Sequence, residues 1–450
     1  AVEAVCAGVD LHPEDALTLV ADLASASLLS VRRGVAGEAR YWMLEMVREY
    51  AAEQLAAAGE QVDVRMRHLA YFAGFAAAAS EKLHGRDQVV WLDRLEQDRG
   101  NLLAALDWSL DADPARGLEV AANLYWYWRM RGPFGEGLEW LEGLLQAAPD
   151  AAPAIRAHAH EGAGRLAVHQ ANWAAAREHL GVATRMWREL DDPLHLARTL
   201  VATAMINEDW LLTGDSRDLR EPDPIPALHE AIALGRRASD HVSLSYALLW
   251  LAAPTGRTDL DAAYAMLAES LQISREAGDD WVVATGFLQT GHTASGAGDW
   301  VRALDSYRRT LHMFRTLKEP WGIAIALAFV ARCELATGNI EAARESANES
   351  LLVPGALPQP VAFDVLAGVA AATEDLERAL VLHGAAIGQP TADPRMTSDL
   401  DAQPWIARAR KLMDEATLLS TWRRGQEMSR AEAIEFGLGR DGAGEVASSS

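Results

Sequence analysis

The stretch Gly298-Asp299-Trp300-Val301-Arg302-Ala303 recurs 40 residues later as Gly338-Asn339-Ile340-Glu341-Ala342-Ala343. Each copy has a turn residue, a polar residue, a bulky apolar residue and, three positions further on, a small residue. Further copies with this spacing lie at residues 132–137, 171–176 and 258–263, and a weaker copy lies at 374–379. A period of about 40 residues indicates stacked copies of one structural unit and not the core of a globular enzyme.

The residue types of one copy predict a hairpin of two helices. Gly298 ends the first helix, where the backbone needs a left-handed residue, and Asp299 caps the second helix through its side-chain oxygen. Ala303 marks a close crossing of the two helices, because a larger side chain would push them apart. Gly291 on the first helix is expected to face Ala303 across this crossing. In other copies the same roles fall to Gly338, Asn339, Ala343, Gly164 and Ala176.

This pattern resembles the tetratricopeptide repeat, lengthened to about 40 residues. The resemblance covers residues 115–390 and gives seven copies if the irregular one at 196–238 is counted. That copy carries an insertion from Trp210 to Pro226, which contains Gly214 and three prolines. Because no helix can run through such spacing, we expect a projecting loop there.

The composition indicates a helical and acidic protein. The chain has 450 residues, of which 50% are hydrophobic, and a formal net charge of -23. A charge of this sign repels phosphate backbones, so we expect this segment to make no direct contact with nucleic acid. No apolar run is long enough for a membrane helix and no signal peptide is visible, which favours a cytoplasmic location. Cys6 and Cys333 have no metal-site spacing and are interpreted as buried thiols.

The first 60 residues have a different pattern. A helix is expected from Asp15 to Leu29 and another from Glu45 to Ala58. Between them, Leu29–Arg32 and Arg40–Leu44 alternate around the glycine-containing segment 34–38, which predicts a β-hairpin. Helix, hairpin and helix form the back half of a winged-helix module. The predicted fold class is therefore all-α, a tetratricopeptide-like α-solenoid of helix-hairpin repeats preceded by a partial winged-helix element with a small β-hairpin.

Six segments carry a resemblance to a known family: Leu28-Leu29, Tyr41–Ala51, Arg67–Phe72, Trp91–Glu96, Asn101–Leu106 and Arg430–Ile434. They resemble the region after the nucleotide-binding domain of bacterial STAND-type signalling ATPases. These include LuxR-type regulators with large sensor regions and the antibiotic regulatory protein family of actinobacteria. The resemblance implies a transcriptional regulator in which a nucleoside triphosphatase switch lies upstream and the repeat superhelix senses a signal.

The chain departs from that family's full architecture in two ways. No G-x-x-x-x-G-K-[ST] phosphate loop occurs, and no basic helix-turn-helix can be placed in the acidic C-terminal third. We therefore expect no cofactor in this chain, with ATP and Mg²⁺ bound only by a missing upstream domain. The start of the chain inside a predicted helix, Ala1–Val5, favours a piece of a longer polypeptide. The predicted domains are a winged-helix-like element at 1–60, a helical connector at 61–114, the repeats at 115–390, C-terminal capping helices at 391–436 and a flexible tail at 437–450.

No set of residues predicts catalysis. His229-Glu230 lacks the second histidine of a zinc protease motif, because Ala233 stands in its place. Gly214-Asp215-Ser216 has no histidine partner in view. The interpretation is a protein that is not an enzyme, without catalytic or metal-binding residues.

Residues on the first helix of each pair are expected to line the concave groove of such a superhelix. The candidate ligand-binding residues in this groove are Trp126, Arg129, Glu161, Arg165, His169, Trp210, His292 and Arg332. Aromatic rings beside Arg and Glu suit an amphipathic small molecule or a peptide.

Two alternatives to ligand binding stay open at these positions. Glu161 and Arg165 could pair only with each other, one helical turn apart on a solvated face. The run Tyr125–Trp128 could pack in the core near Trp91 and Trp108. Four successive aromatic residues cannot all face one side of a helix, so we expect at least one to be exposed or to lie in the groove.

These observations predict the signal-sensing and protein-interaction superhelix of a cytoplasmic bacterial transcriptional regulator. It would bind a small-molecule or peptide effector and control an upstream nucleotide-binding switch. Its partners would be that effector, a partner protein or its own upstream ATPase domain, without nucleic acid or membrane, and homo-oligomerisation stays open. The alternative is a peptide- or protein-binding scaffold without a small-molecule ligand, and an enzyme is a weaker third. The sequence chooses neither the effector, nor the target genes, nor the oligomeric state.

Overall fold

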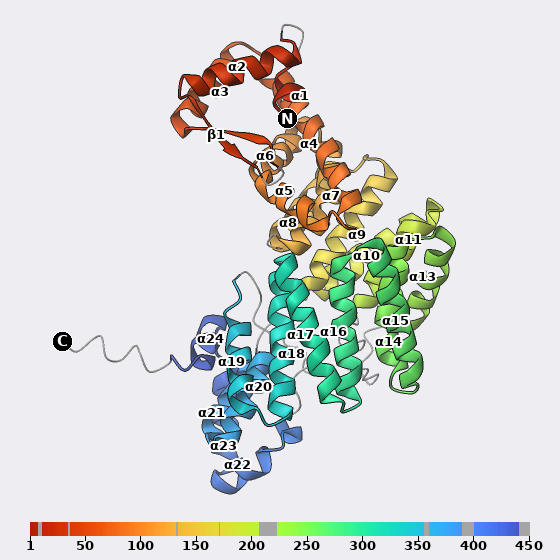
Figure 1. Cartoon of the computed structure of the whole chain (residues 1–450), viewed down its shortest axis with the longest axis vertical. Helices are drawn as coiled ribbons and strands as arrows, with labels where there is room; N and C mark the ends of the chain where they lie inside the picture. The colour runs from red at the N-terminus through yellow and green to blue at the C-terminus, as the bar shows by residue number, and fades with distance from the viewer. Residues whose placement is uncertain are drawn as a thin grey trace, which may run out of the picture. The chain divides into compact units, whose positions relative to one another are not determined.

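The computed structural model describes residues 1–7, 11–34, 37–131, 134–170, 172–206, 223–354, 360–388 and 400–440. The chain is divided into two compact units, residues 1–195 and residues 196–450. The described part of the first unit contains α1 (Val2–Cys6), α2 (Pro13–Ser25), β1 (Leu29–Arg33), β2 (Ala39–Met43), α3 (Glu45–Ala57), α4 (Gln61–Lys82), α5 (Gln88–Gln97), α6 (Arg99–Ala112), α7 (Pro114–Met130), α8 (Phe134–Ala147), α9 (Pro153–His169) and α10 (Trp173–Glu189) (Figure 1).

The remaining described elements, in chain order, are α11 (Pro193–Met205), α13 (Pro224–Ala238), α14 (His241–Thr255), α15 (Leu260–Ala277), α16 (Asp280–Gly296), α17 (Trp300–Leu317), α18 (Pro320–Ala336), α19 (Ile340–Leu351), α20 (Pro360–Ala372), α21 (Leu376–Gly388), a 3-10 turn (Leu400–Ala402), α22 (Ile406–Leu412), α23 (Glu415–Gln426) and α24 (Arg430–Gly437). None of the described helices has both the length and the apolar character needed to cross a bilayer.

Consecutive helices pack as hairpins, and the first helix of one hairpin contacts the first helix of the next. In the second unit the pairs are α14–α15, α16–α17, α18–α19 and α20–α21, and α14 touches α16 while α18 touches α20 (Figure 1). In the first unit α7–α8 and α9–α10 are paired in the same way, with α7 against α9. The predicted all-α repeat array with a small β-hairpin is therefore confirmed.

The turns between paired helices follow the predicted chemistry at most copies. Gly298 and Gly338 have φ values of 77° and 83°, in the left-handed region that favours glycine. The Asp299 side chain accepts a hydrogen bond from the backbone N–H of Arg302 at 3.0 Å and so caps α17. Asn172 and Asp259 cap α10 and α15 similarly.

The predicted cap at Asn339 is wrong. Its side chain makes no capping hydrogen bond to α19. Instead, Asn339 Nδ2 donates to Thr337 Oγ1 at 3.1 Å, because the amide turns back across the left-handed turn of Gly338 toward the preceding helix. An amide has a donor end that a carboxylate lacks, so it can choose this local partner.

The small residues mark close helix crossings, but the partner of each glycine differs from the prediction. Ala303 is fully buried. A Cβ built on Gly291 would lie only 2.5 Å from the ring of Tyr307, so Gly291 faces Tyr307 and not Ala303. Likewise, a Cβ on Gly164 would lie 2.5 Å from Leu180 Cγ. A helical side chain leans toward the N-terminus of its helix, so the large residue one turn after the alanine covers the crossing.

The N-terminal element contains the predicted hairpin. β1 and β2 are antiparallel, with Leu29 opposite Met43 and Val31 opposite Tyr41. The helix expected to reach Leu29 ends at Ser25, because Ser27 takes a left-handed φ of 61° that stops it. The guanidinium of Arg40 on β2 forms hydrogen bonds with both carboxylate oxygens of Asp98, each at 2.7 Å, and thereby ties the hairpin to the start of α6.

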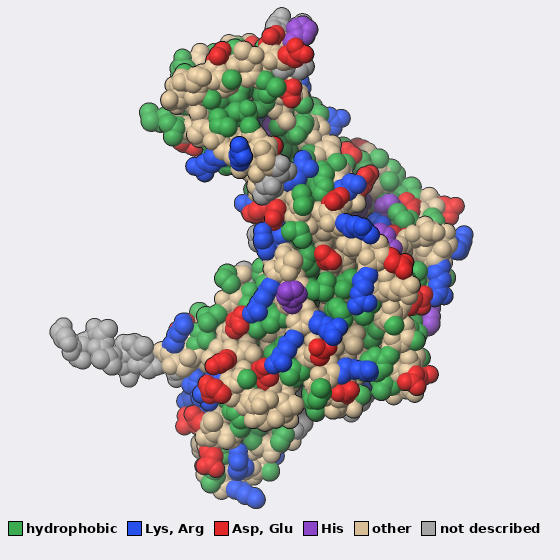
Figure 2. Space-filling model, in the orientation of Figure 1, with side chains coloured by type: hydrophobic (Ala, Val, Ile, Leu, Met, Phe, Trp, Pro, Cys, Tyr) green, Lys and Arg blue, Asp and Glu red, His purple; other side chains and the backbone are tan. Residues whose placement is uncertain are grey.

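The outer surface of this element exposes apolar side chains. Helix α3 has no buried residue. Met46 is 82% exposed, Leu44 70%, Tyr50 63% and Trp42 45%. Figure 2 shows hydrophobic side chains gathered on this element. Apolar patches of this kind mark surfaces that contact other proteins or domains.

Three further sequence predictions need comment. Helix α13 begins at Pro224 and contains Pro226 in its first turn, where a missing N–H costs little, so the expected interruption of the helix up to Pro226 is wrong for these positions. Residues 207–222, which include most of the predicted loop, lie outside the described residues, as do 441–450 of the predicted tail. Cys333 is buried as expected, but Cys6 is exposed.

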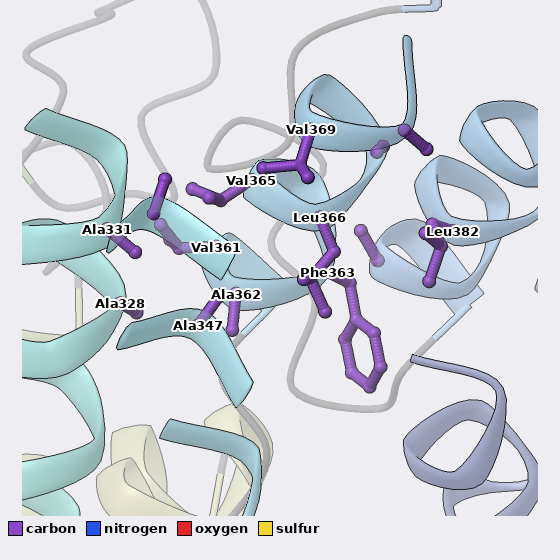
Figure 3. Close-up of a cluster of buried hydrophobic side chains, with 14 of the residues drawn as sticks. Ala328, Ala331, Ala347, Val361, Ala362, Phe363, Val365, Leu366, Val369 and Leu382 are labelled. Atoms are coloured by element: carbon purple, nitrogen blue, oxygen red, sulfur yellow. The ribbon is translucent and has the colours of Figure 1, made fainter. Parts of the chain in front are cut away.

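A large hydrophobic core of the second unit lies where α18, α19, α20 and α21 meet. Phe363, Ala343 and Ala347 are fully buried there. Val361, Leu366 and Val369 on α20 and Leu382 on α21 belong to the same cluster (Figure 3). This core holds the last repeats together and gives them a rigid apolar interior.

We predict that Ala303→Trp destabilises the protein by about 1–3 kcal/mol, because a bulky side chain at a filled helix crossing forces the hairpin apart. Val301→Trp on the same helix is the matched control, since Val301 is 79% exposed. Thermal melting of both variants measures the effect. A melting temperature of Ala303→Trp equal to that of the control would contradict the assigned crossing.

Candidate functional site

Helices α7 and α9 of the first unit bring together most of the predicted groove residues. Arg165 Nε donates a hydrogen bond to Glu161 Oε1 at 3.0 Å. Glu161 is 2% exposed and the Arg165 side chain 12%. The pairing one turn apart that the sequence left open is therefore formed, but on a buried face and not on a solvated one. A buried ion pair of this kind is costly to desolvate and needs further polar contacts around it.

Aromatic rings surround these charges. The Arg165 guanidinium lies 5.9 Å from the centroid of the Tyr125 ring, and the Arg129 guanidinium lies 5.9 Å from that of Phe134. Phe134, at the start of α8, also stacks on His169 with ring centroids 5.5 Å apart. Cation–π contacts of desolvated guanidinium groups are stronger than those at exposed sites. The charged side chains of this cluster are therefore surrounded by the faces of aromatic rings.

The electrostatics of the cluster keep His169 neutral. Burial lowers the pKa of His169 well below its ordinary value, and the positive charges of Arg129 and Arg165 lower it further. At neutral pH the imidazole therefore has one donor and one acceptor nitrogen and no charge. The charged groups of this cluster are therefore Arg129, Arg165 and Glu161.

The aromatic run on α7 packs in the core, which is one of the two interpretations that the sequence left open. Tyr125, Trp126, Tyr127 and Trp128 are all buried, with 7%, 5%, 2% and 1% exposed. Helix α7 contacts α4, α5, α6, α8 and α9, so neighbouring helices cover all four rings and none of them is exposed. Trp126 lies against His84, with ring centroids 4.6 Å apart.

Sequence reasoning missed Phe134 as a member of the cluster and His84 as the ring partner of Trp126. Both come from other elements and reach their partners only through tertiary packing, so no local spacing could indicate them. Trp210, the other aromatic candidate, lies outside the described residues.

In the second unit, His292 and Arg332 lie near each other across one aromatic ring. Phe329 is in contact with His292, with ring centroids 4.4 Å apart, and the Arg332 guanidinium lies 5.3 Å from the Phe329 centroid. A hydrogen bond of 2.8 Å joins Tyr307 Oη and His292 Nδ1. Burial, with Arg332 nearby, lowers the pKa of His292 to about 3.

Asp364 on α20 adds a third polar side chain to His292 and Arg332, and we call these three residues the row of the second unit. Sequence reasoning did not single out Asp364. Asp364 Oδ2 lies 3.9 Å from Arg332 Nη2, and Asp364 Oδ1 accepts a hydrogen bond from Gln403 Nε2 at 3.0 Å. His383 Nδ1 accepts from Trp422 Nε1 at 3.0 Å. Because an indole N–H can only donate, neutral His383 has its proton on Nε2, which lies 4.0 Å from Asp364 Oδ1.

The row in the second unit is thus a half-buried Arg–Asp pair backed by fixed polar groups. The Arg332 side chain is 33% exposed and that of Asp364 13%. A guanidinium and a carboxylate at this exposure can exchange their mutual contact for the charged groups of a ligand. Within the described ranges, no three His, Cys, Asp or Glu side chains are arranged to hold a metal ion.

Comparison with known proteins gives a partial match to regulators. No family model matches the chain. It is 30% identical over 322 residues to two proteins named "Putative HTH-type transcriptional regulator", one from Mycobacterium bovis and one from Mycobacterium tuberculosis. Each match covers 68% of this chain and 35% of the relative, so the chain spans about a third of the length of these relatives.

Several solved structures are similar at low identity. A Rap protein complexed with competence and sporulation factor is 14% identical, with a TM-score of 0.47 over 83% of this chain and 96% of that chain. A STAND protein with a tetratricopeptide repeat sensor from Pyrococcus horikoshii is 16% identical, with a TM-score of 0.43 over 91% and 61%. NprR in complex with its peptide NprX is 15% identical, with a TM-score of 0.44 over 77% and 96%. These scores are low, and the description of the fold rests on the helix packing above.

We predict that His292 makes the protein less stable as the pH falls below 6.5. The pKa of His292 is lowered from 6.5 to about 3 by folding, so between these values only the unfolded chain takes up the proton. The free energy of unfolding then falls by about 1.4 kcal/mol per pH unit for this group. His292→Gln, which keeps a hydrogen-bond acceptor for Tyr307, should flatten the dependence measured by urea unfolding between about pH 6.5 and 4. The control is His229→Gln at an exposed position, and an unchanged slope in His292→Gln would contradict the prediction.

Proposed function

We propose that the chain is the signal-sensing superhelix of a cytoplasmic bacterial transcriptional regulator. The observation that carries the proposal is the convergence of Arg129, Glu161, Arg165 and His169 from two neighbouring first helices, among aromatic rings. Charges of both signs beside π faces give a bound molecule a direction, which suits an amphipathic effector or a short peptide. Transcriptional regulation is suggested by the names of the relatives, which the chain matches over part of their length.

A buried site of this kind can act as a sensor because its occupancy changes the packing of a hairpin. Arg165 pairs with Glu161 within α9. A ligand carboxylate that competes for Arg165, or a ligand amine that competes for Glu161, would alter how α9 packs on α7. Repeat arrays transmit such changes because each hairpin is stabilised mainly by its neighbours.

The N-terminal element supplies the surface through which the signal would be passed on. In the proposed arrangement this element is the second half of a winged helix in a STAND-type regulator of the LuxR or antibiotic regulatory protein kind. The exposed apolar side chains of Trp42, Leu44, Met46 and Tyr50 then contact the upstream nucleotide-binding domain of the same protein. ATP and Mg²⁺ belong to that domain and not to this chain.

A second candidate function is a scaffold that binds a peptide or protein partner without a small-molecule ligand. The observation that favours it is the row of His292, Arg332 and Asp364, which offers both charges on neighbouring first helices at partial exposure. Such a row matches the alternating donor and acceptor groups of an extended peptide better than a single compact molecule.

The sensor proposal predicts that Arg129→Gln with Arg165→Gln raises the effector concentration for half-maximal transcription by about tenfold or more in the full-length regulator. Each substitution keeps a hydrogen-bond donor but removes the charge, and charge-assisted hydrogen bonds are the stronger ones. Arg177→Gln at an exposed position of α10 is the control. A reporter assay measures the response, and circular dichroism checks the fold. A folded double variant with a normal response would contradict this site and leave the row of His292, Arg332 and Asp364 as the remaining candidate.

A further inference from the structure

A pocket lies outside the predicted groove, under the C-terminal helix α24. It has a volume of about 280 Å³ and is formed by α19, the end of α20, α21 and the end of α24. Every residue that lines it belongs to the second unit and is described by the structure. Its walls are fixed by close packing: a Cβ on Gly437 would lie 3.0 Å from Leu351 Cδ1, so the end of α24 sits directly on the core.

The floor of the pocket is apolar and belongs to the core of the last repeats. Leu366 and Val369 on α20 and Leu382 on α21 line it, and all three are members of the buried cluster in Figure 3. An apolar cavity of about 150 Å³ is enough to hold one benzene ring. The volume here therefore admits a body of about two fused rings.

The polar wall of the pocket is positively charged. The lining contains Arg344 and Arg378 but no aspartate or glutamate. This is notable in a chain with a formal net charge of -23, where an acidic lining would be the expectation. The two guanidinium groups favour an anionic group on any molecule that enters.

The two arginines have different structural roles. Arg378 Nη2 donates hydrogen bonds to the carbonyl oxygens of Phe436 and Gly437, and its guanidinium lies 4.7 Å from the centroid of the Phe436 ring. Arg378 therefore holds the end of α24 in place and contributes only its field. Arg344 pairs with Glu341 at 3.3 Å, with side chains 41% and 70% exposed. Surface pairs of this kind are worth about 0–1 kcal/mol, so Arg344 is able to turn to a ligand.

Asn348 provides a second polar contact on the same helix face. It lies one turn after Arg344 and lines the pocket. Its Oδ1 is buried and makes no hydrogen bond within the described residues. The NH2 group at the other end of this amide is a donor that can serve an anion beside Arg344 without any turn of the side chain.

We propose that this pocket binds a small monocarboxylic acid whose body is aromatic or branched aliphatic. The carboxylate contacts Arg344 and the Asn348 amide, and the body lies on Leu366, Val369 and Leu382. The site is separate from the groove cluster on α7 and α9, so it does not depend on the function proposed above. Because the end of α24 forms one wall of the pocket, binding stabilises the packing of the C-terminal helices on the last repeat.

The test uses 2-naphthoate as the acid probe and 2-naphthamide as its neutral counterpart, each titrated into the whole chain by calorimetry at constant ionic strength. We expect saturable binding of 2-naphthoate at one site and weaker binding of 2-naphthamide. Arg344→Gln should weaken 2-naphthoate binding about tenfold, as expected for one lost charge-assisted hydrogen bond, and leave 2-naphthamide unchanged. Thr373→Trp, at an exposed position on the rim, should obstruct both probes.

Arg315→Gln is the matched control, because Arg315 forms an exposed pair with Glu349 outside the pocket lining. It should bind both probes like the unchanged protein, and thermal melting checks that each variant is folded. Absence of saturable 2-naphthoate binding at millimolar concentration would overturn the proposal. Equal binding by Arg344→Gln and the unchanged protein would also overturn it, since the probe would then lie elsewhere, such as on the apolar surface of the N-terminal element.

Discussion

The array depends on glycines at which two helices approach closely. At each of them, a large side chain of the neighbouring helix occupies the space that a Cβ atom would need. Leu180 occupies that place at Gly164, and the Tyr307 ring occupies it at Gly291. The same relation holds between Leu271 and Gly286, and between Leu335 and Gly368, where a Cβ would lie 2.7 Å and 2.5 Å from the nearest atom. Since every other residue type would place a Cβ atom in this space, the glycines set the distance between these helices. At Gly164 and Gly291 the alanine one turn before the large residue, Ala176 or Ala303, is also fully buried.

This packing also orders the polar groups that we assign to function. The Tyr307 ring that fills the place at Gly291 stacks on Phe329 with centroids 5.2 Å apart, and its hydroxyl bonds to His292. Phe329 in turn lies beneath the Arg332 guanidinium. The side chains of the row are therefore held by core residues and not by loops. Sites built on rigid elements keep their geometry before a ligand arrives, which lowers the entropy lost on binding.

The repeat could be predicted from sequence because its signals are local. A left-handed glycine, a capping carboxylate and a small residue act within a few positions of each other, and the period repeats them. The misplaced cap at Asn339 shows the limit even there, since an amide has more than one local partner. For Tyr125–Trp128 the sequence offered core packing only as one of two interpretations, because the burial of all four rings depends on helices α4, α5 and α6, which lie outside the repeat pattern.

The candidate sites were predictable only in part for the same reason. Helical spacing indicated Glu161, Arg165, His292 and Arg332, which share equivalent faces of first helices. Asp364 needed the contact between α18 and α20, and its partner Gln403 comes from a segment 39 residues further on that shows no repeat signal. The pocket under α24 was equally invisible, because Arg344 and Arg378 belong to different hairpins and meet only when the C-terminal helix packs on both.

A double-mutant cycle at Gly164 and Leu180 tests the central packing claim most directly, since this pair has no polar groups. Leu180→Ala should cost about 2–5 kcal/mol through the cavity it leaves, and Gly164→Ala about 1–3 kcal/mol through overpacking. The free energy of unfolding of each variant is measured in urea. If Leu180 fills the space where a Cβ of Gly164 would lie, the double variant should lose less of this free energy than the two single losses added together, by about 1 kcal/mol or more, because each change relieves the other. Additivity within about 0.3–0.5 kcal/mol would contradict the claim that glycines of the first helices set the spacing of the array.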